Sequence, residues 1–220
     1  MKLYQFPWGI YPRRIHVYLK EKGISGIEMV ELDVVAGDNR KPDYLARNPT
    51  GTIPALETDD GRVICQSSTI LLYLEQLHPS PDMIGGTPAD QARTHDQLAL
   101  VNEAYNFAGI CTYYGSPLFV QRRKPSDEVA KAMHFEYARV LASLEGMAGG
   151  GDYLGGETPN IADVTFFASE QFMRDLYKLR LPKELTKLEA IFNRFLQRPS
   201  AAPEAYPDFM VPIAPLRDFL

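Results

Sequence analysis

NPTGTIPALETDDGRVICQSSTILLYL, residues 48–74, is the stretch that decides the fold. Two short extended runs, 55–58 and 62–65, flank an Asp-Asp-Gly sequence that is typical of a turn between strands. A polar Gln-Ser-Ser-Thr run then precedes a row of aliphatic residues, which predicts a helix that begins at Ser67 or Ser68 behind capping side chains. The backbone N–H groups at such a helix start are open, and an anion binds well there.

A second signal lies in the Ile53-Pro54 step at the start of the first of these strands. Proline cannot donate a ladder hydrogen bond, and X-Pro bonds are the places where a cis peptide is accessible. A cis bond here would leave the backbone N–H and C=O of Ile53 pointing outward, where an extended peptide could pair with them. The stretch therefore predicts a peptide-binding edge and an anion site about one strand apart.

The two motifs together, TGTIPAL at 50–56 and CQSSTILLYLEQ at 65–76, resemble the glutathione-binding half of the cytosolic glutathione transferases. The resemblance implies that glutathione is the co-substrate. It also implies that the backbone beside Ile53 and Pro54 pairs with the cysteinyl part of glutathione, and that Gln66 and Ser67 hold the γ-glutamyl carboxylate and amine. Taken singly, the first motif is equally consistent with an ordinary strand start and the second with an ordinary helix cap.

The residues before this stretch predict a βαβ unit. The run 2–6 has the pattern of a strand, a helix follows with Pro12 in its first turn and Gly23 at its end, and a second extended run covers 27–34. Strand, helix and strand within about 30 residues predict two parallel strands with a right-handed crossover. With the hairpin and the next helix, they predict an α/β thioredoxin-like N-terminal domain.

The second half of the chain predicts an all-helical domain. A cluster of proline and glycine marks a linker at 79–89, and the apolar spacing is then helical over about 88–113 and again over 129–144. Asn160 and Asp163 form a capping box that begins a third, central helix. The predicted architecture is that of the glutathione transferases: a glutathione-binding domain at 1–78, the linker, and a helical domain at 90–220 that carries the electrophile pocket.

Further segments toward the C-terminus fit the same pattern. The capping sequence at 158–163 and the segment 188–200 also resemble this family, so the resemblance covers nearly the whole chain. The proline-rich tail from Ala201 is expected to be irregular.

Composition excludes several other classes of protein. A net charge of −5 over 220 residues argues against nucleic-acid binding, and the basic triplet 122–124 is expected to be a solvated loop. The four histidines and the two cysteines, Cys65 and Cys111, have no metal-site spacing, so no metal is expected and both thiols are expected to be buried. The chain has neither a membrane-spanning apolar run nor a leader pattern, which predicts a cytoplasmic protein without a membrane partner.

The resemblance also implies that a basic or amide side chain in 37–47 binds the glycine carboxylate of glutathione. Asn39, Arg40 and Lys41 occupy this segment. Members of the family often carry a further polar or basic residue two positions before the proline, but Thr52 is too short to replace a lysine there. We therefore expect Arg40 and Lys41 to bind the carboxylate, with loop solubility as their alternative role.

Catalysis requires that the glutathione thiol become a thiolate. Lowering a thiol pKa of about 8.5 by two units needs about 2.7 kcal/mol. A helix N-terminus supplies roughly 0.3 to 1 kcal/mol, so one charge-assisted hydrogen bond, worth about 1.5 to 3 kcal/mol, is also needed. In the family a Tyr near the end of the first strand, or a Ser or Cys in the next loop, donates it.

The usual donor is absent from this chain. Gly9 stands where the Ser would be, the loop contains no Cys, and Tyr4 is one residue away from the tyrosine position, which reverses its face. Mixed-disulfide chemistry of the cysteine-containing branches is therefore not expected. The Tyr-Pro-x-Arg pattern at 11–14 resembles a bacterial and fungal branch that lacks the standard residue.

We therefore expect Tyr11 to be the catalytic residue, acting directly or through a water. The backbone N–H of Ile10 or of Tyr11 is the alternative donor, and packing in the domain core is the alternative role of the Tyr11 side chain.

The second substrate is expected to lie between the loop after the first strand and the first long helix of the second domain. The predicted pocket residues are Trp8, Ile10, Tyr105, Tyr113 and Tyr114. For any single one of these tyrosines a core position is favoured, but at least one of the three is expected to line the pocket.

Three functions are consistent with these residues. The first is conjugation of glutathione to a hydrophobic, aromatic electrophile. The second is a glutathione-dependent disulfide or peroxide reductase, and the third is a non-catalytic glutathione-binding module. The resemblance also implies a homodimer, with the helix from Ser67 and the helix after Pro88 at the contact.

Overall fold

The computed structural model describes residues 1–202, 206, 208 and 210–216. The chain divides into two compact units, residues 1–83 and 84–220, and the division falls within the segment predicted as the linker. In the tail after Ala201, residues 203–205, 207, 209 and 217–220 lie outside the described residues.

The first unit contains a four-stranded sheet in the order β2-β1-β3-β4. Its strands are β1 (Lys2–Gln5), β2 (Glu28–Glu31), β3 (Ala55–Glu57) and β4 (Val63–Ile64). β1 pairs parallel with β2 and antiparallel with β3, and β3 pairs antiparallel with β4. The predicted βαβ unit, hairpin and thioredoxin-like arrangement are confirmed.

The second extended run is shorter than predicted. β2 ends at Glu31, because Asp33 starts a turn in which its carboxylate accepts from the N–H of Ala36 at 2.8 Å. Gly37 follows with a φ of 85°, a left-handed conformation that a β-branched residue would not adopt readily.

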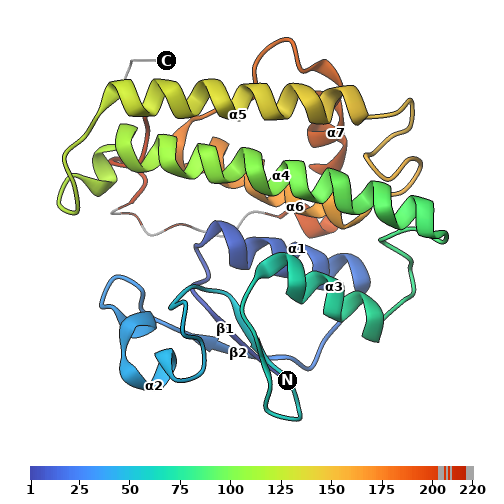
Figure 1. The fold of residues 1–220 in the computed structure, drawn as a ribbon, viewed down its shortest axis with the longest axis horizontal. Helices are drawn as coiled ribbons and strands as arrows, with labels where there is room; N and C mark the ends of the chain where they lie inside the picture. Colours follow the sequence, from blue (N-terminus) through green and yellow to red (C-terminus); the bar gives the residue numbers. More distant parts are fainter. Residues whose placement is uncertain (203–205, 207, 209, 217–220) are drawn as a thin grey trace. The chain divides into compact units, whose positions relative to one another are not determined.

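Two helices of the first unit, α1 (Ile10–Lys22) and α3 (Ser67–Leu77), lie side by side along the sheet (Figure 1). A buried carboxylate joins their C-terminal halves: Glu75 accepts from the Tyr18 hydroxyl at 2.5 Å and pairs with Lys22 at 2.9 Å. A 3₁₀ turn, η1 (Asp38–Arg40), and the short α2 (Pro42–Leu45) lie between β2 and β3 in the chain.

The second unit is helical, as predicted. Its α-helices are α4 (Pro88–Gly115), α5 (Asp127–Met147), α6 (Ile161–Phe172) and α7 (Thr186–Phe195). Shorter turns are η2 (Pro117–Phe119), the π-helical η3 (Met173–Tyr177) and η4 (Pro199–Ala201). α4 and α5 run antiparallel beside one another (Figure 1), and every residue of α6 is buried, which confirms its central position.

The predicted capping box begins α6. The Asn160 side chain accepts from the N–H groups of Ala162 and Asp163, and the Asp163 carboxylate accepts from the N–H of Asn160 at 2.9 Å. Asp163 also accepts from the N–H groups of Leu154 and Gly155. The box therefore ties the preceding loop to α6.

A fully buried carboxylate, Glu170, joins the helices of this unit. It accepts from the hydroxyls of Tyr105 at 2.8 Å and Tyr137 at 2.9 Å, and from Nε of Arg174 at 2.6 Å. Arg174 in turn binds the carboxylate of Glu189 on α7. Since buried charges are costly unless paired, this network fixes how four helices and the π-turn pack.

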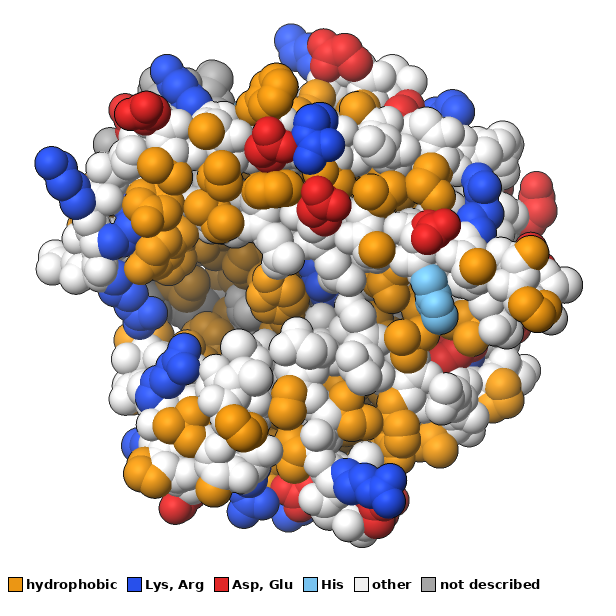
Figure 2. Space-filling model, viewed as in Figure 1, with side chains coloured by type: hydrophobic (Ala, Val, Ile, Leu, Met, Phe, Trp, Pro, Cys, Tyr) orange, Lys and Arg blue, Asp and Glu red, His pale blue; other side chains and the backbone are white. Residues whose placement is uncertain are grey.

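The surface carries charges of both signs. Both cysteines are free thiols. Within the described ranges, no helix is long and apolar enough to cross a membrane, and no cluster of His, Cys, Asp or Glu is suited to a metal ion. Figure 2 shows basic and acidic side chains interspersed over the visible face. Cys111 is buried, and its burial raises the thiol pKa to about 12. The prediction that Cys65 is also buried is wrong, because it lies partly exposed just after β4.

Candidate functional site

The loop that leads to Pro54 is held by a network of amide and hydroxyl groups. Asn48 Nδ2 and the Tyr44 hydroxyl both donate to the carbonyl of Thr52, at 2.7 and 2.6 Å, while Asn48 Oδ1 accepts from the N–H of Thr50. Asn39 Nδ2 donates to the carbonyl of Gly51 at 2.7 Å. Asn39, Tyr44 and Asn48 therefore shape the candidate site, and sequence reasoning did not assign them this role.

Glycine suits position 51 of this loop for two reasons. Its φ is +62°, a left-handed conformation that residues with a side chain rarely adopt, and a Cβ there would lie 3.1 Å from the carbonyl oxygen of Asn39. The Asn-Pro-Thr-Gly sequence is the signal that would have revealed a tight, side-chain-braced turn.

The Ile53-Pro54 peptide bond is cis. The Ile53 side chain packs against the buried cluster of Tyr4, Tyr44 and Ala55. Among the hydrogen bonds of the described residues, none involves the backbone N–H or C=O of Ile53. This backbone edge therefore keeps both groups available for an extended peptide.

The two predicted motifs meet through the hairpin register. Leu56 pairs with Ile64 and Glu57 with Val63, so the start of β3 and the end of β4 lie at the same end of the hairpin. Pro54 directly precedes β3 and Gln66 follows β4 by two residues, which brings the Ile53 edge to the same end as the start of α3. One ligand of tripeptide size can thus span both.

The helix α3 begins at Ser67, as predicted, but Gln66 at the N-cap makes no side-chain capping hydrogen bond. The prediction that a side chain caps this helix is therefore wrong for Gln66. Gln66 is exposed, whereas Ser67 is buried and its Oγ lies 3.5 Å from Nη1 of Arg14. An uncapped helix start with a serine and a glutamine is suited to binding a carboxylate.

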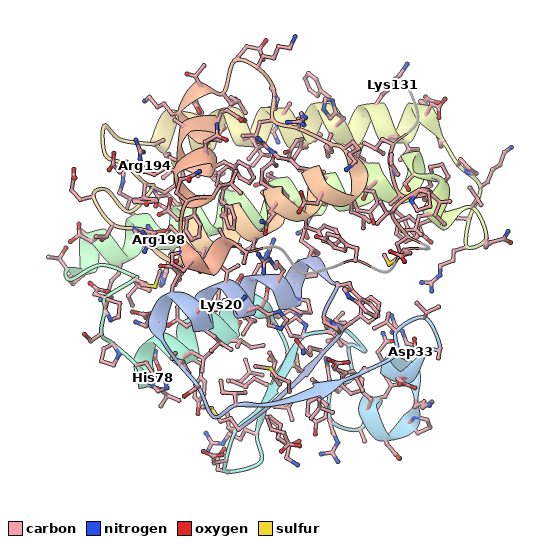
Figure 3. All side chains as sticks on the ribbon, turned by 180° about the vertical axis from the view of Figure 1, so that it is seen from behind. Lys20, Asp33, His78, Lys131, Arg194 and Arg198 are labelled. Carbon is pink, nitrogen blue, oxygen red and sulfur yellow. The ribbon has the colours of Figure 1, made fainter. Side chains whose placement is uncertain are left out.

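Arg40 and Lys41 lie in the segment between β2 and α2, a few residues after Asp33, which is labelled in Figure 3. Both side chains are exposed. Arg40 Nη1 donates to the carbonyl of Thr50 at 3.4 Å, so it adjoins the loop before Pro54. Lys41 pairs with Asp38 at 2.6 Å, and this hydrogen bond raises the pKa of Lys41 and lowers that of Asp38.

The loop after β1 has little room for a side chain at Gly9. Gly9 is the N-cap of α1 and its N–H donates to the carbonyl of Phe6 at 2.9 Å. A Cβ at Gly9 would lie 3.0 Å from Cδ of Pro12. Trp8 packs edge-on against Phe6, with ring centroids 5.0 Å apart.

The two tyrosines of this region have different surroundings. Tyr11, in the first turn of α1, is 36% exposed, and the guanidinium of Arg14 lies 4.8 Å from its ring centroid. Tyr4 is buried in the sheet and its hydroxyl donates to Glu57 at 2.7 Å. Burial and this hydrogen bond raise the pKa of Tyr4. Tyr4 is therefore a structural residue, whereas Tyr11 is partly open to solvent.

The three tyrosines predicted for the second-substrate pocket separate into two groups. Tyr105 is 1% exposed and is committed to Glu170, so its environment is that of a core side chain. Tyr113 and Tyr114 are partly exposed near the end of α4, and the Arg123 guanidinium lies 4.4 and 4.7 Å from their ring centroids. The prediction that the basic triplet is simply solvated is wrong for Arg123, which also donates to the carbonyl of Tyr114.

A cavity of about 660 Å³ opens elsewhere in the second unit, between η3 and α7. It is lined by basic, acidic and a few apolar side chains: Gln171, Arg174, Asp175, Lys178, Arg180, Glu189, Phe192, Asn193, Leu196, Arg198, Pro199, Ala201 and Ala202. Arg198 is labelled in Figure 3 beyond the end of α7. This charged lining does not fit a hydrophobic electrophile.

Comparison with known proteins supports the resemblance to the glutathione transferases. Residues 8–77 match the family described as glutathione S-transferase, N-terminal domain. The chain is also 31% identical over 183 residues to a maleylacetoacetate isomerase of Pseudomonas aeruginosa, a match that covers 78% of this chain and 82% of that protein. The chain belongs to the cytosolic glutathione transferase superfamily.

One further relative and one similar solved structure come from yeast. Glutathione S-transferase 2 of Saccharomyces cerevisiae is 29% identical over 212 residues, 91% of this chain and 87% of that protein. The crystal structure of Gtt2 from the same organism has a TM-score of 0.80 at 28% identity and covers 91% of this chain and 98% of that one. Membership of the superfamily makes glutathione the co-substrate and the activity glutathione-dependent.

Proposed function

We propose that this glutathione transferase joins the thiol of glutathione to a hydrophobic, aromatic electrophile, by addition or by displacement of a leaving group. The observation that carries the proposal is the juxtaposition in one unit of the Ile53 backbone edge and the uncapped start of α3. The first can pair with the main chain of a peptide and the second can bind its carboxylate.

Each part of glutathione then has a partner. The cysteinyl backbone pairs with the N–H and C=O of Ile53 beside Pro54, and the γ-glutamyl carboxylate and amine bind Ser67 and Gln66. Arg40 binds the glycine carboxylate, because it adjoins the loop before Pro54. Lys41, which is already paired with Asp38, adds positive charge to the same region.

The thiol lies at the start of α1 in this proposal. With Gly9 in place of a side-chain donor, the donors are the Tyr11 hydroxyl, directly or through a water, and the backbone N–H groups of the first turn. Helix α1 has no side-chain cap, which leaves its N-terminal dipole open to a thiolate. Trp8 and Ile10, in the loop and first turn beside the thiol, provide apolar contacts for the electrophile.

A glutathione-dependent isomerase is the second candidate function, favoured by the relative named maleylacetoacetate isomerase at 31% identity. In such a reaction the thiolate adds to a double bond and leaves again, so the same site serves. Two more functions would use the same binding site: a disulfide or peroxide reductase, in which bound glutathione supplies the thiol, and a non-catalytic binding module. The proposal also includes a homodimer through α3 and α4, and a cytoplasmic location.

Steady-state assays separate these functions. We expect turnover of at least one aryl halide or ether with glutathione, and at least a hundredfold loss of kcat/KM in a Ser67→Ala, Gln66→Ala double variant. Background rates with every aryl substrate would contradict conjugation. In that case, turnover of maleylacetoacetate would favour the isomerase and turnover of hydroxyethyl disulfide the reductase. Glutathione binding without any turnover would favour the module.

A further inference from the structure

Arg14 on α1 contacts two of the candidate site residues at once. Its side chain is 1% exposed, and its Nη1 atom lies 3.5 Å from Oγ of Ser67, at the first residue of α3. Its guanidinium carbon lies 4.8 Å from the ring centroid of Tyr11, three residues earlier on the same face of α1. One buried cation thus lies between the two ends of the candidate glutathione site.

The contact with Arg14 determines whether the Ser67 hydroxyl accepts or donates a hydrogen bond there. A guanidinium only donates hydrogen bonds, so Ser67 Oγ accepts from Arg14 and its own O–H proton is left to donate to another group. A carboxylate only accepts. The contact therefore prepares Ser67 to donate to a carboxylate, and the positive charge of Arg14 adds to the attraction of the α3 N-terminus for an anion.

The Tyr11 contact constrains a side chain that is otherwise partly open to solvent. A guanidinium within about 6 Å of a ring centroid attracts the ring face. The i, i+3 spacing lets Arg14 hold Tyr11 without any rearrangement of the helix. The Tyr11 hydroxyl is thereby kept at a defined place beside the start of α1.

Other side chains besides Arg14 join α1 to α3. Tyr18 and Lys22 already join α1 to Glu75 of α3 at the other end of the two helices. That second, purely structural link provides a matched control for the role of Arg14.

We propose that Arg14 is a positioning residue that couples the two ends of the glutathione site. It directs the Ser67 hydroxyl toward the γ-glutamyl carboxylate and holds Tyr11 beside the thiol. This inference rests on the proposed binding of glutathione at Ile53 and Ser67.

The test compares Arg14→Met with Tyr18→Phe in the full chain. Calorimetry gives the Kd for glutathione and for S-methylglutathione, and absorbance of the thiolate against pH gives the pKa of the bound thiol. We expect Arg14→Met to raise both Kd values about tenfold, the loss of one charge-assisted hydrogen bond, and to raise the bound-thiol pKa. Tyr18→Phe should lower the melting temperature but leave both Kd values and the thiol pKa unchanged.

A double-mutant cycle measures the coupling directly. Because Arg14 acts through Ser67, the double variant Ser67→Ala, Arg14→Met should raise the Kd for glutathione by clearly less than the product of the two single fold-increases. If Arg14→Met does not fold, Arg14→Lys replaces it, since lysine keeps the charge but not the planar fork, and we expect a three- to tenfold higher Kd.

Two results would overturn the inference. One is a folded Arg14 variant whose Kd stays within about twofold of the wild-type value and whose thiol pKa stays within about 0.2 of it. The other is a double variant whose Kd rises by the full product of the fold-increases of Arg14→Met and Ser67→Ala. If the wild-type protein itself bound no glutathione, the proposed function would fail instead.

Discussion

Substitution of Gly9 by serine tests why this glutathione transferase lacks the usual side-chain donor. A Cβ at this position would lie 3.0 Å from Cδ of Pro12 and 3.2 Å from the carbonyl oxygen of Phe6. Overpacking of this kind costs about 1–3 kcal/mol. The backbone at Gly9, with φ −87° and ψ 144°, suits any residue, so the cost comes from contact and not from strain.

Two smaller effects oppose this cost. Serine is a better N-cap than glycine by a few tenths of a kcal/mol, and replacing glycine reduces the entropy of the unfolded chain by an equivalent of about 0.4–1 kcal/mol. We therefore expect Gly9→Ser to lower the free energy of unfolding by about 1 kcal/mol. Gly9→Ala should lose about 1 kcal/mol more, because alanine cannot cap α1.

Urea unfolding followed by circular dichroism measures these differences. Absorbance of the glutathione thiolate reports the second effect of Gly9→Ser, since a new hydroxyl donor should lower the pKa of the bound thiol by about 1 unit. Gly9→Ala, which adds the Cβ without a donor, should leave that pKa unchanged. Wild-type stability in both variants would show that the loop has room for a side chain, and would refute the steric explanation of Gly9.

Three other predictions concern stability and binding. Glu170→Ala removes the shared acceptor of two tyrosines and Arg174. In urea unfolding it should lower the free energy of unfolding by about 3–5 kcal/mol, whereas Tyr105→Phe should lower it by about 1.5–3 kcal/mol. Equal losses in the two variants would contradict the network. Burial raises the pKa of Asp163 from 3.8 to about 6, although its backbone hydrogen bonds act in the opposite direction. Its stabilising contribution is therefore full below about pH 4 and is lost as the pH rises through 6, and Asp163→Asn should flatten the pH dependence of the unfolding midpoint in that window. Asn48→Ala should raise the Kd for glutathione at least threefold and lower the free energy of unfolding by about 1–3 kcal/mol. An unchanged Kd would show that the loop held by Asn48 does not contribute to glutathione binding.

Local patterns in the sequence predict the first unit well. The Asp-Asp-Gly turn between two extended runs defines the hairpin, and the hairpin brings the residues before β3 and after β4, Pro54 and Gln66 among them, to the same end of the two strands. The Asn160 capping box and the apolar run of α6 likewise depend on residues within a few positions of one another. In these cases the interacting groups are close in sequence, so their spacing carries the information.

Interactions between distant residues are not visible in this way. Tyr105 has the spacing of any aromatic on an amphipathic helix, and only the fold reveals that Glu170 accepts a hydrogen bond from its hydroxyl. The same holds for Arg123 among its aromatic neighbours and for Arg14 beside Ser67. Periodicity identifies which face of a helix is buried but not which polar partner meets it there.

A crystal structure of the protein with glutathione tests the central claim most directly. We expect the N–H and C=O of Ile53 to form hydrogen bonds with the cysteinyl backbone, and the γ-glutamyl carboxylate to accept from Ser67 at the start of α3. Glutathione bound elsewhere on the protein, or bound without a contact to Ile53 and Ser67, would contradict the account.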